Sequence, residues 1–133
     1  MRIVIDTNVI ASAVFYGGKP YLLLRYVMED CVEVVASKEI VDEYEEIILR
    51  LQQKYPAITT KIPLHDILAK LEIIRVSSDI HVSRDPDDDK FISCAMDGKC
   101  LYIVSGDSDL LSIGKYEGIE ILTVADFLDR MKG

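Results

Sequence analysis

RIVID, residues 2–6, is the stretch that decides the fold of this 133-residue chain. Three of its residues are β-branched and apolar, and the run ends at a carboxylate, Asp6. A short apolar run of this kind predicts a strand buried inside a sheet. An acid directly after such a strand has no role in a core, so Asp6 either opens a turn, caps the next helix or serves a site.

Further apolar runs and helical patterns alternate along the rest of the chain. Strands are expected at residues 32–36, 73–77, 101–105 and 119–124. Helices are expected at 20–30, 38–55 (capped by Ser37), 64–72 and 86–96, then a short one through Leu111 and a last one after Thr123. This alternation predicts a three-layer α/β/α fold with a central parallel sheet, as a single domain over residues 1–133.

Composition narrows the classes of function. No apolar run approaches the roughly 20 residues that span a bilayer, and MRIVIDTN is too short and too acidic for a signal peptide, so we expect a cytoplasmic protein without a membrane partner. The three cysteines form no C-x-x-C pair, which argues against a disulfide framework or a zinc knuckle. Half of the residues are hydrophobic, as in an ordinary globular protein.

The formal net charge of −8 is unusual for a protein that binds nucleic acid. Eight acids lie in the candidate site segments described below, and setting them aside would bring the charge to zero. Bound divalent cations would make this acidity compatible with a phosphate substrate. Candidate basic contacts are scattered along the chain: Lys19, Arg25, Arg50, Lys54, Lys61 and Lys90.

Ligands of open parallel sheets bind outside the carboxyl ends of the strands, so acids at those ends are the first candidates. Asp6 follows the first strand directly, and Asp107 follows the 101–105 strand after two residues. Glu43 lies along the edge of the inward stripe of the 38–55 helix. Each of these acids has an alternative reading, as a turn or cap residue for the two aspartates and as a solvated residue for Glu43.

The segment RDPDDDK, residues 84–90, carries four acids in five residues. Asp85 is expected to cap a helix that has Pro86 in its first turn. Helix capping accounts for one or two acids but not for four that repel one another. Asp89 can share the buried edge of that helix, whereas Asp87 and Asp88 are expected further out; a solvated cap remains the alternative.

Acids from four separate segments form the set of hard oxygen ligands that suits Mg²⁺ or Mn²⁺ and not zinc. Two such ions about 4 Å apart can drive phosphodiester hydrolysis. The chain has no phosphate-binding P-loop, no G-x-G-x-x-G and no G-x-S-x-G.

The opening IVIDTN, the Glu43 helix, the segment DPDDDKFI and the closing SGDSDLL together resemble the PIN domain family, and within it the VapC-like toxins of toxin–antitoxin pairs. The resemblance implies a metal-dependent ribonuclease and a likeness in fold over the whole chain. It implies Asp6, Glu43, Asp89 and Asp107 as catalytic metal ligands. It also implies auxiliary roles for Asn8, Ser105 and Asp109, in addition to the auxiliary acid Asp85. It further implies a homodimer and a small antitoxin partner.

Two rival functions stay open from the sequence. One is a non-catalytic binding module with the same fold, although such a module has no reason to keep acids that repel one another. The other is a small Mg²⁺-dependent phosphatase, which would favour a second acid where Asn8 stands. A DNA substrate is also compatible with these acids.

Overall fold

The computed structural model of the protein describes residues 1–132, and β1 (Arg2–Ile5) lies at the centre of its sheet. Ile3, Val4 and Ile5 are all fully buried, because β1 has strands on both sides and helices on both faces. The expectation for the first apolar run is therefore confirmed.

The sheet has six strands in the order β3-β2-β1-β4-β6-β5. All neighbours are parallel except β5 and β6, which form an antiparallel pair at one edge. The remaining strands are β2 (Glu33–Ser37), β3 (Glu72–Ile74), β4 (Tyr102–Val104), β5 (Lys115–Tyr116) and β6 (Ile119–Leu122).

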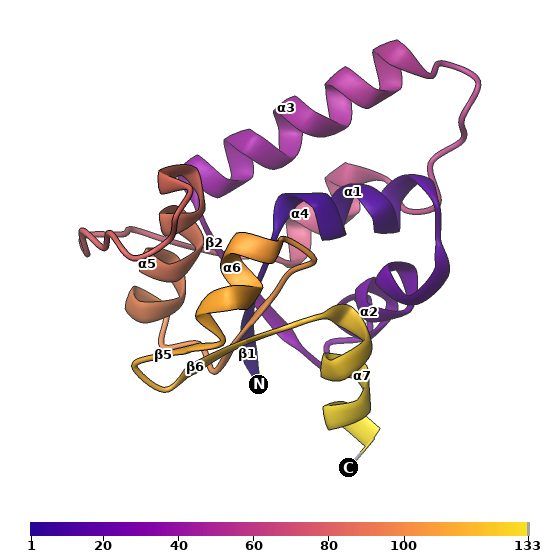
Figure 1. The fold of residues 1–133 in the computed structure, drawn as a ribbon. Coiled ribbons are helices and arrows are strands. Elements are labelled where there is room, and N and C mark those ends of the chain that lie inside the picture. The colour runs from indigo at the N-terminus through magenta and orange to yellow at the C-terminus, as the bar shows by residue number, and fades with distance from the viewer. Residues whose placement is uncertain (133) are drawn as a thin grey trace.

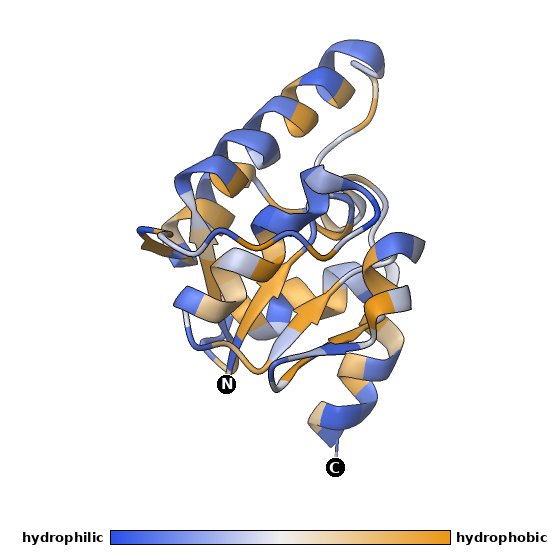
Figure 2. Ribbon diagram, turned by 60° about the vertical axis from the view of Figure 1, so that its left-hand side comes forward, coloured by the Kyte–Doolittle hydropathy of each residue, from blue (hydrophilic) through white to orange (hydrophobic). Residues whose placement is uncertain are grey.

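Helices cover both faces of this sheet (Figure 1). In that view α5 lies on one side of the strands, and α1, α2 and α7 lie on the other. The helices are α1 (Thr7–Phe15), α2 (Gly18–Met28), α3 (Lys38–Lys54), α4 (Leu64–Lys70), α5 (Asp89–Asp97), α6 (Ser108–Ile113) and α7 (Val124–Lys132), with a 3₁₀ turn, η1 (Pro86–Asp88), before α5. The predicted three-layer α/β/α architecture is confirmed, and Figure 2 shows the apolar strands enclosed by helices with polar outer faces.

Two elements were not predicted. Helix α1 begins directly after β1, and Asp6 caps it by accepting a hydrogen bond from the Asn8 amide. Strand β5 has only two residues and follows a tight turn at Gly114, where φ is +72°. The expected strand at 73–77 is reduced to β3, because the chain leaves the sheet after Ile74 to form a long loop.

Helix α3 is fastened to the centre of the sheet by Tyr44, whose fully buried hydroxyl donates a hydrogen bond to the carbonyl of Ile5. This contact brings the neighbouring residue, Glu43, to the carboxyl end of β1. The predicted cap of α3 is present, since the Ser37 hydroxyl accepts from the amide of Ile40. No helix within residues 1–132 is long and apolar enough to cross a membrane.

Candidate functional site

The candidate site lies at the carboxyl ends of β1 and β4, which are neighbours in the sheet. From β1 the chain continues to β2 and β3 on one side, whereas β4 leads to β6 on the other. The strand order therefore reverses between β1 and β4, and such a switch point leaves a crevice in which α/β proteins bind ligands.

Ser105 joins the two acids that follow these strands. Its fully buried hydroxyl donates to Asp6 Oδ2 over 2.6 Å and accepts from the backbone amide of Asp107 over 2.9 Å. The Asp107 carboxylate also caps α6, accepting from the Leu110 amide over 3.0 Å. Both aspartates are thus held in fixed positions by the protein itself.

Asp6 is only 5% exposed although no basic side chain contacts it among the described residues. Burial raises the pKa of this carboxyl, and the charges of Asp107 and Glu43 add to the effect, while hydrogen bonds from Ser105 and Asn8 oppose it. A buried carboxylate beside other acids is an environment that a cation would stabilise.

Glu43 reaches the same region from α3. The Thr7 hydroxyl donates to its Oε1, and the ammonium of Lys90 lies 2.6 Å from its Oε2. Lys90 had been expected among the scattered basic contacts, but it lies inside the site, with a side chain only 11% exposed. Both carboxylate oxygens of Glu43 therefore have partners within the protein.

The acid that faces Asp6 and Asp107 from the start of α5 is Asp88. Its buried Oδ2 has no hydrogen-bond partner in the described structure. Burial, and then the Asp107 carboxylate, with which it can share a proton, raise the pKa of Asp88 to about 7, and the charges of Asp85 and Asp6 contribute further. The sequence predicts an outer position for Asp88; the residue is partly exposed, but its Oδ2 is buried.

Asp89, the acid expected as the third ligand, is buried but engaged elsewhere. Its Oδ1 accepts from the backbone amides of Val82 and Ser83, over 3.1 and 2.8 Å, and so ties the preceding loop to α5. A second aspartate, Asp97, holds the same loop at the other end of α5 through Ser77 and Ser78. Oδ1 of Asp89 is thus engaged by the loop, whereas the buried Oδ2 of Asp88 has no partner among the described residues.

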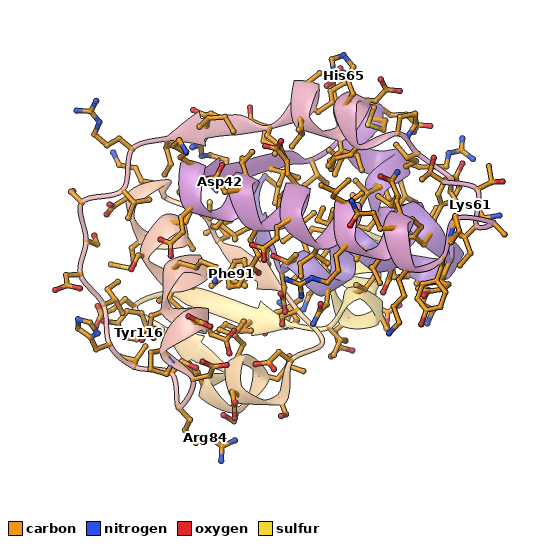
Figure 3. All side chains as sticks on the ribbon, turned by 90° about the horizontal axis from the view of Figure 1, so that it is seen from above. Asp42, Lys61, His65, Arg84, Phe91 and Tyr116 are labelled. Atoms are coloured by element: carbon orange, nitrogen blue, oxygen red, sulfur yellow. The ribbon has the colours of Figure 1, made fainter. Side chains whose placement is uncertain are left out.

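The predicted auxiliary acids, Asp85 and Asp109, lie on the outer side of Asp88, and one oxygen of each of the three lies within 4.8 Å of the others. Both outer acids have partners, since Asp85 accepts from the Asp87 amide and Asp109 pairs with Arg84 at 2.8 Å. Figure 3 shows Arg84 projecting from the edge of the molecule.

Two cavities flank the acids. One, of about 510 Å³, lies beneath the loop before α5 and is lined by Asp87, Asp89 and Lys90 among others. The other, of about 550 Å³, lies beside Asp107 and is lined by the predicted auxiliary Asn8 with several hydroxyl side chains, including Ser12 and Thr123. The acid cluster is therefore open to a ligand that extends on both sides of it.

The sequence did not predict that Thr7, Asp88 and Lys90 belong to the acid site. The helical pattern could not separate Asp88 from Asp89, because α5 is buried on nearly all sides and the chain enters it through a 3₁₀ turn that shifts the helical phase. Thr7 and Lys90 each stand beside a predicted acid, but only the folded geometry turns them toward Glu43.

Comparison with known proteins agrees with this geometry. Residues 2–109 match the PIN domain family. A protein of Methanocaldococcus jannaschii described as uncharacterized is 32% identical over 129 residues, covering 85% of this chain and 75% of its own length. No solved structure matches the chain. With this match, the three-layer fold and the acids at its switch point, the chain belongs to the PIN domain family, whose members are generally metal-dependent nucleases.

Proposed function

We propose that the protein is an endoribonuclease that hydrolyses phosphodiester bonds with Mg²⁺ or Mn²⁺. The observation that carries the proposal is the meeting of Asp6, Asp88 and Asp107 at the switch point of the sheet, with a buried oxygen of Asp88 left without a donor. Structural acids are normally paired or solvated, so an unpaired buried carboxylate oxygen calls for a cation.

The residues fit a divalent metal ion. The donors are carboxylate oxygens, which suit Mg²⁺ or Mn²⁺. One oxygen each of Asp85, Asp88 and Asp109 lies within 4.8 Å of the others, and Asp107 and Asp6 lie close enough to Asp88 for their charges to raise its pKa. Asp6, Asp88 and Asp107 would hold the ion, which when bound supplies an activated water and positive charge at the phosphate. Asp88 takes the place that the sequence suggested for Asp89, and Glu43 is treated below.

The protein's own part in the reaction is to hold these acids in place and to bind the substrate. Ser105 fixes the spacing of Asp6 and Asp107, and the cap of α6 prevents Asp107 from turning away. Among the described residues, the serine that bonds to an acid of the site is Ser105, and its hydroxyl is fully buried and engaged by Asp6 and by the Asp107 amide, which favours direct attack by water.

RNA is the proposed substrate because the cavities on either side of the acids have the size of small-ligand sites and one is rich in hydroxyl and amide groups. Asn8, Ser12 and Thr123 can exchange hydrogen bonds with ribose 2′-hydroxyls, the groups that distinguish RNA from DNA. The net charge of −8 disfavours binding of long duplexes through backbone charge alone.

From the resemblance to VapC-like toxins we further propose that the protein is a toxin that acts in the cytoplasm as a homodimer. A small antitoxin would block its site. The acid cluster supports this role, because a basic side chain of a partner protein would find several carboxylates at an open surface. These points stay predictions.

The test is cleavage of labelled RNAs and single-stranded DNA with Mg²⁺, Mn²⁺ or EDTA. Asp6→Asn should reduce cleavage at least about 100-fold, because even indirect partners of metal ligands are worth 10- to 100-fold. Asp42→Asn is the control, since it makes the same charge change on the exposed side of α3 (Figure 3). Metal-independent cleavage, or cleavage that survives in Asp6→Asn, would refute the proposal, and hydrolysis of small phosphomonoesters instead of RNA would identify a phosphatase.

A further inference from the structure

Lys90 is a nearly buried cation placed within the acid cluster. Its ammonium lies 2.6 Å from Glu43 Oε2, donates a hydrogen bond to the carbonyl of Asp87 over 2.7 Å, and sits 5.1 Å from the centre of the Phe91 ring. Phe91 itself is in the interior (Figure 3), and only 1% exposed. The lysine is thus fixed by a carboxylate, a carbonyl and an aromatic ring.

Its low exposure distinguishes Lys90 from a lysine that binds substrate phosphates at the surface. The Lys90 side chain is 11% exposed, whereas Lys38, at the start of α3, is 86% exposed. A buried ammonium is retained only where its charge is compensated, and the compensating group here is Glu43.

Each oxygen of Glu43 has a partner, and the positive charge of the Lys90 ammonium would repel a divalent ion that approached Oε2. Thr7 donates to Oε1 and Lys90 faces Oε2. The three inner acids, Asp6, Asp88 and Asp107, have no such cation among residues 1–132. Within the described residues, Glu43 on α3 therefore has a lysine partner and the outer acid Asp109 has an arginine partner, whereas Asp6, Asp88 and Asp107 form no ion pair.

We propose that Lys90 takes the place of a second divalent ion: it neutralises Glu43, and so restricts divalent metal to the Asp6, Asp88 and Asp107 side of the site. This inference rests on the proposed function, since it concerns how that metal site is filled. Lys90 acts here as a positioning residue, because its contact with the Asp87 carbonyl also holds the turn that carries Asp88.

The experiment is a titration of the full chain with Mn²⁺ alone, followed by calorimetry and by electron paramagnetic resonance. Lys90→Met, which keeps the length of the side chain and removes its charge, should bind one more Mn²⁺ per chain than the wild type, and the added ion should broaden the six-line signal by coupling to its neighbour. Lys38→Met is the matched control and should bind the same number of ions as the wild type.

The double variant Glu43→Gln/Lys90→Met covers the case in which Lys90→Met alone fails to fold, because it removes both charges of the pair together. It should bind as many Mn²⁺ ions as the wild type, with a Kd within threefold. An unchanged ion count in folded Lys90→Met, or a tenfold loss of affinity in the double variant, would overturn the inference and leave the nuclease proposal intact. A wild type that binds no Mn²⁺ would instead overturn the proposed function, and the inference with it.

Discussion

Replacing Asp88 with Asn should stabilise the metal-free protein while abolishing its metal site. The pKa of Asp88 is raised from 3.8 to about 7, and each unit corresponds to about 1.4 kcal/mol, which sets a ceiling of about 4 kcal/mol on the cost of ionising it in the fold. Asp88 is partly exposed, so screening by water reduces the realistic cost to about 1–2 kcal/mol. An Asn amide removes this cost and can donate to Asp107.

The sign of the pH dependence follows from the direction of the shift. The folded pKa lies above the unfolded one, so the metal-free wild type should lose stability as the pH rises from about 4 to about 7, and stay at the lower value above that range. At pH 8 in EDTA, Asp88→Asn should melt about 4–7 °C above the wild type, given a typical unfolding entropy for a chain of this length. The difference should vanish near pH 4, where both proteins are neutral at this position.

Mg²⁺ should reverse the order of the melting temperatures of the wild type and Asp88→Asn. Added Mg²⁺ stabilises only a protein that binds it in the folded state, so it should raise the melting temperature of the wild type and leave Asp88→Asn unchanged. Asp87→Asn removes the same charge at the neighbouring exposed position. It should melt at the wild-type temperature in EDTA, and Mg²⁺ should still stabilise it. If Asp88→Asn melted at or below the wild-type temperature in EDTA at pH 8, the reasoning from the unpaired carboxylate would be refuted.

Three further predictions concern the framework of the site. Asp89→Ala should lower the free energy of unfolding by about 2–3 kcal/mol, because the amides of Val82 and Ser83 lose their acceptor. Hydrogen exchange should become faster at these two amides, and an unchanged exchange rate would contradict the anchoring role of Asp89. Tyr44→Phe should lower stability in urea by about 1–2 kcal/mol, since the buried carbonyl of Ile5 loses its donor; no loss would show that this bond does not fasten α3. Gly98→Ala should lower the free energy of unfolding by about 1–3 kcal/mol in the same assay, because a Cβ there would lie 2.8 Å from a Val35 methyl. An unchanged free energy of unfolding would mean that β2 can shift away from this Cβ at little cost.

The centre of the fold could be predicted because its signals are local and mutually consistent. RIVI is followed directly by an acid, and the 101–105 run is followed by Asp107 two residues later. Together with the capped α3, these runs predict a parallel sheet. Helix α1 was missed because it follows β1 without a loop, and because its β-branched residues do not favour a helix when considered alone.

The sequence predicts where in the fold the site lies, but it does not determine which acid of the 84–90 segment faces it. Asp6 and Asp107 follow buried strands, so their position depends only on the sheet. The choice between Asp88 and Asp89 depends on a 3₁₀ turn and on which acid the preceding loop engages, and both are long-range properties. The Lys90–Glu43 pair joins residues 47 positions apart, a contact that no local pattern encodes.

The bond between Ser105 and Asp6 joins residues 99 positions apart, and the Asp6 amide donates to the carbonyl of Val104, the residue before Ser105. Closing so long a loop costs conformational entropy, and proteins rich in contacts of such separation fold slowly. A nascent chain on the ribosome therefore has no assembled acid cluster until β4 has emerged and paired with β1. Under the proposed function, a chain that ends before β4 cannot cleave RNA, because Asp107 and its contact with Ser105 are missing from it.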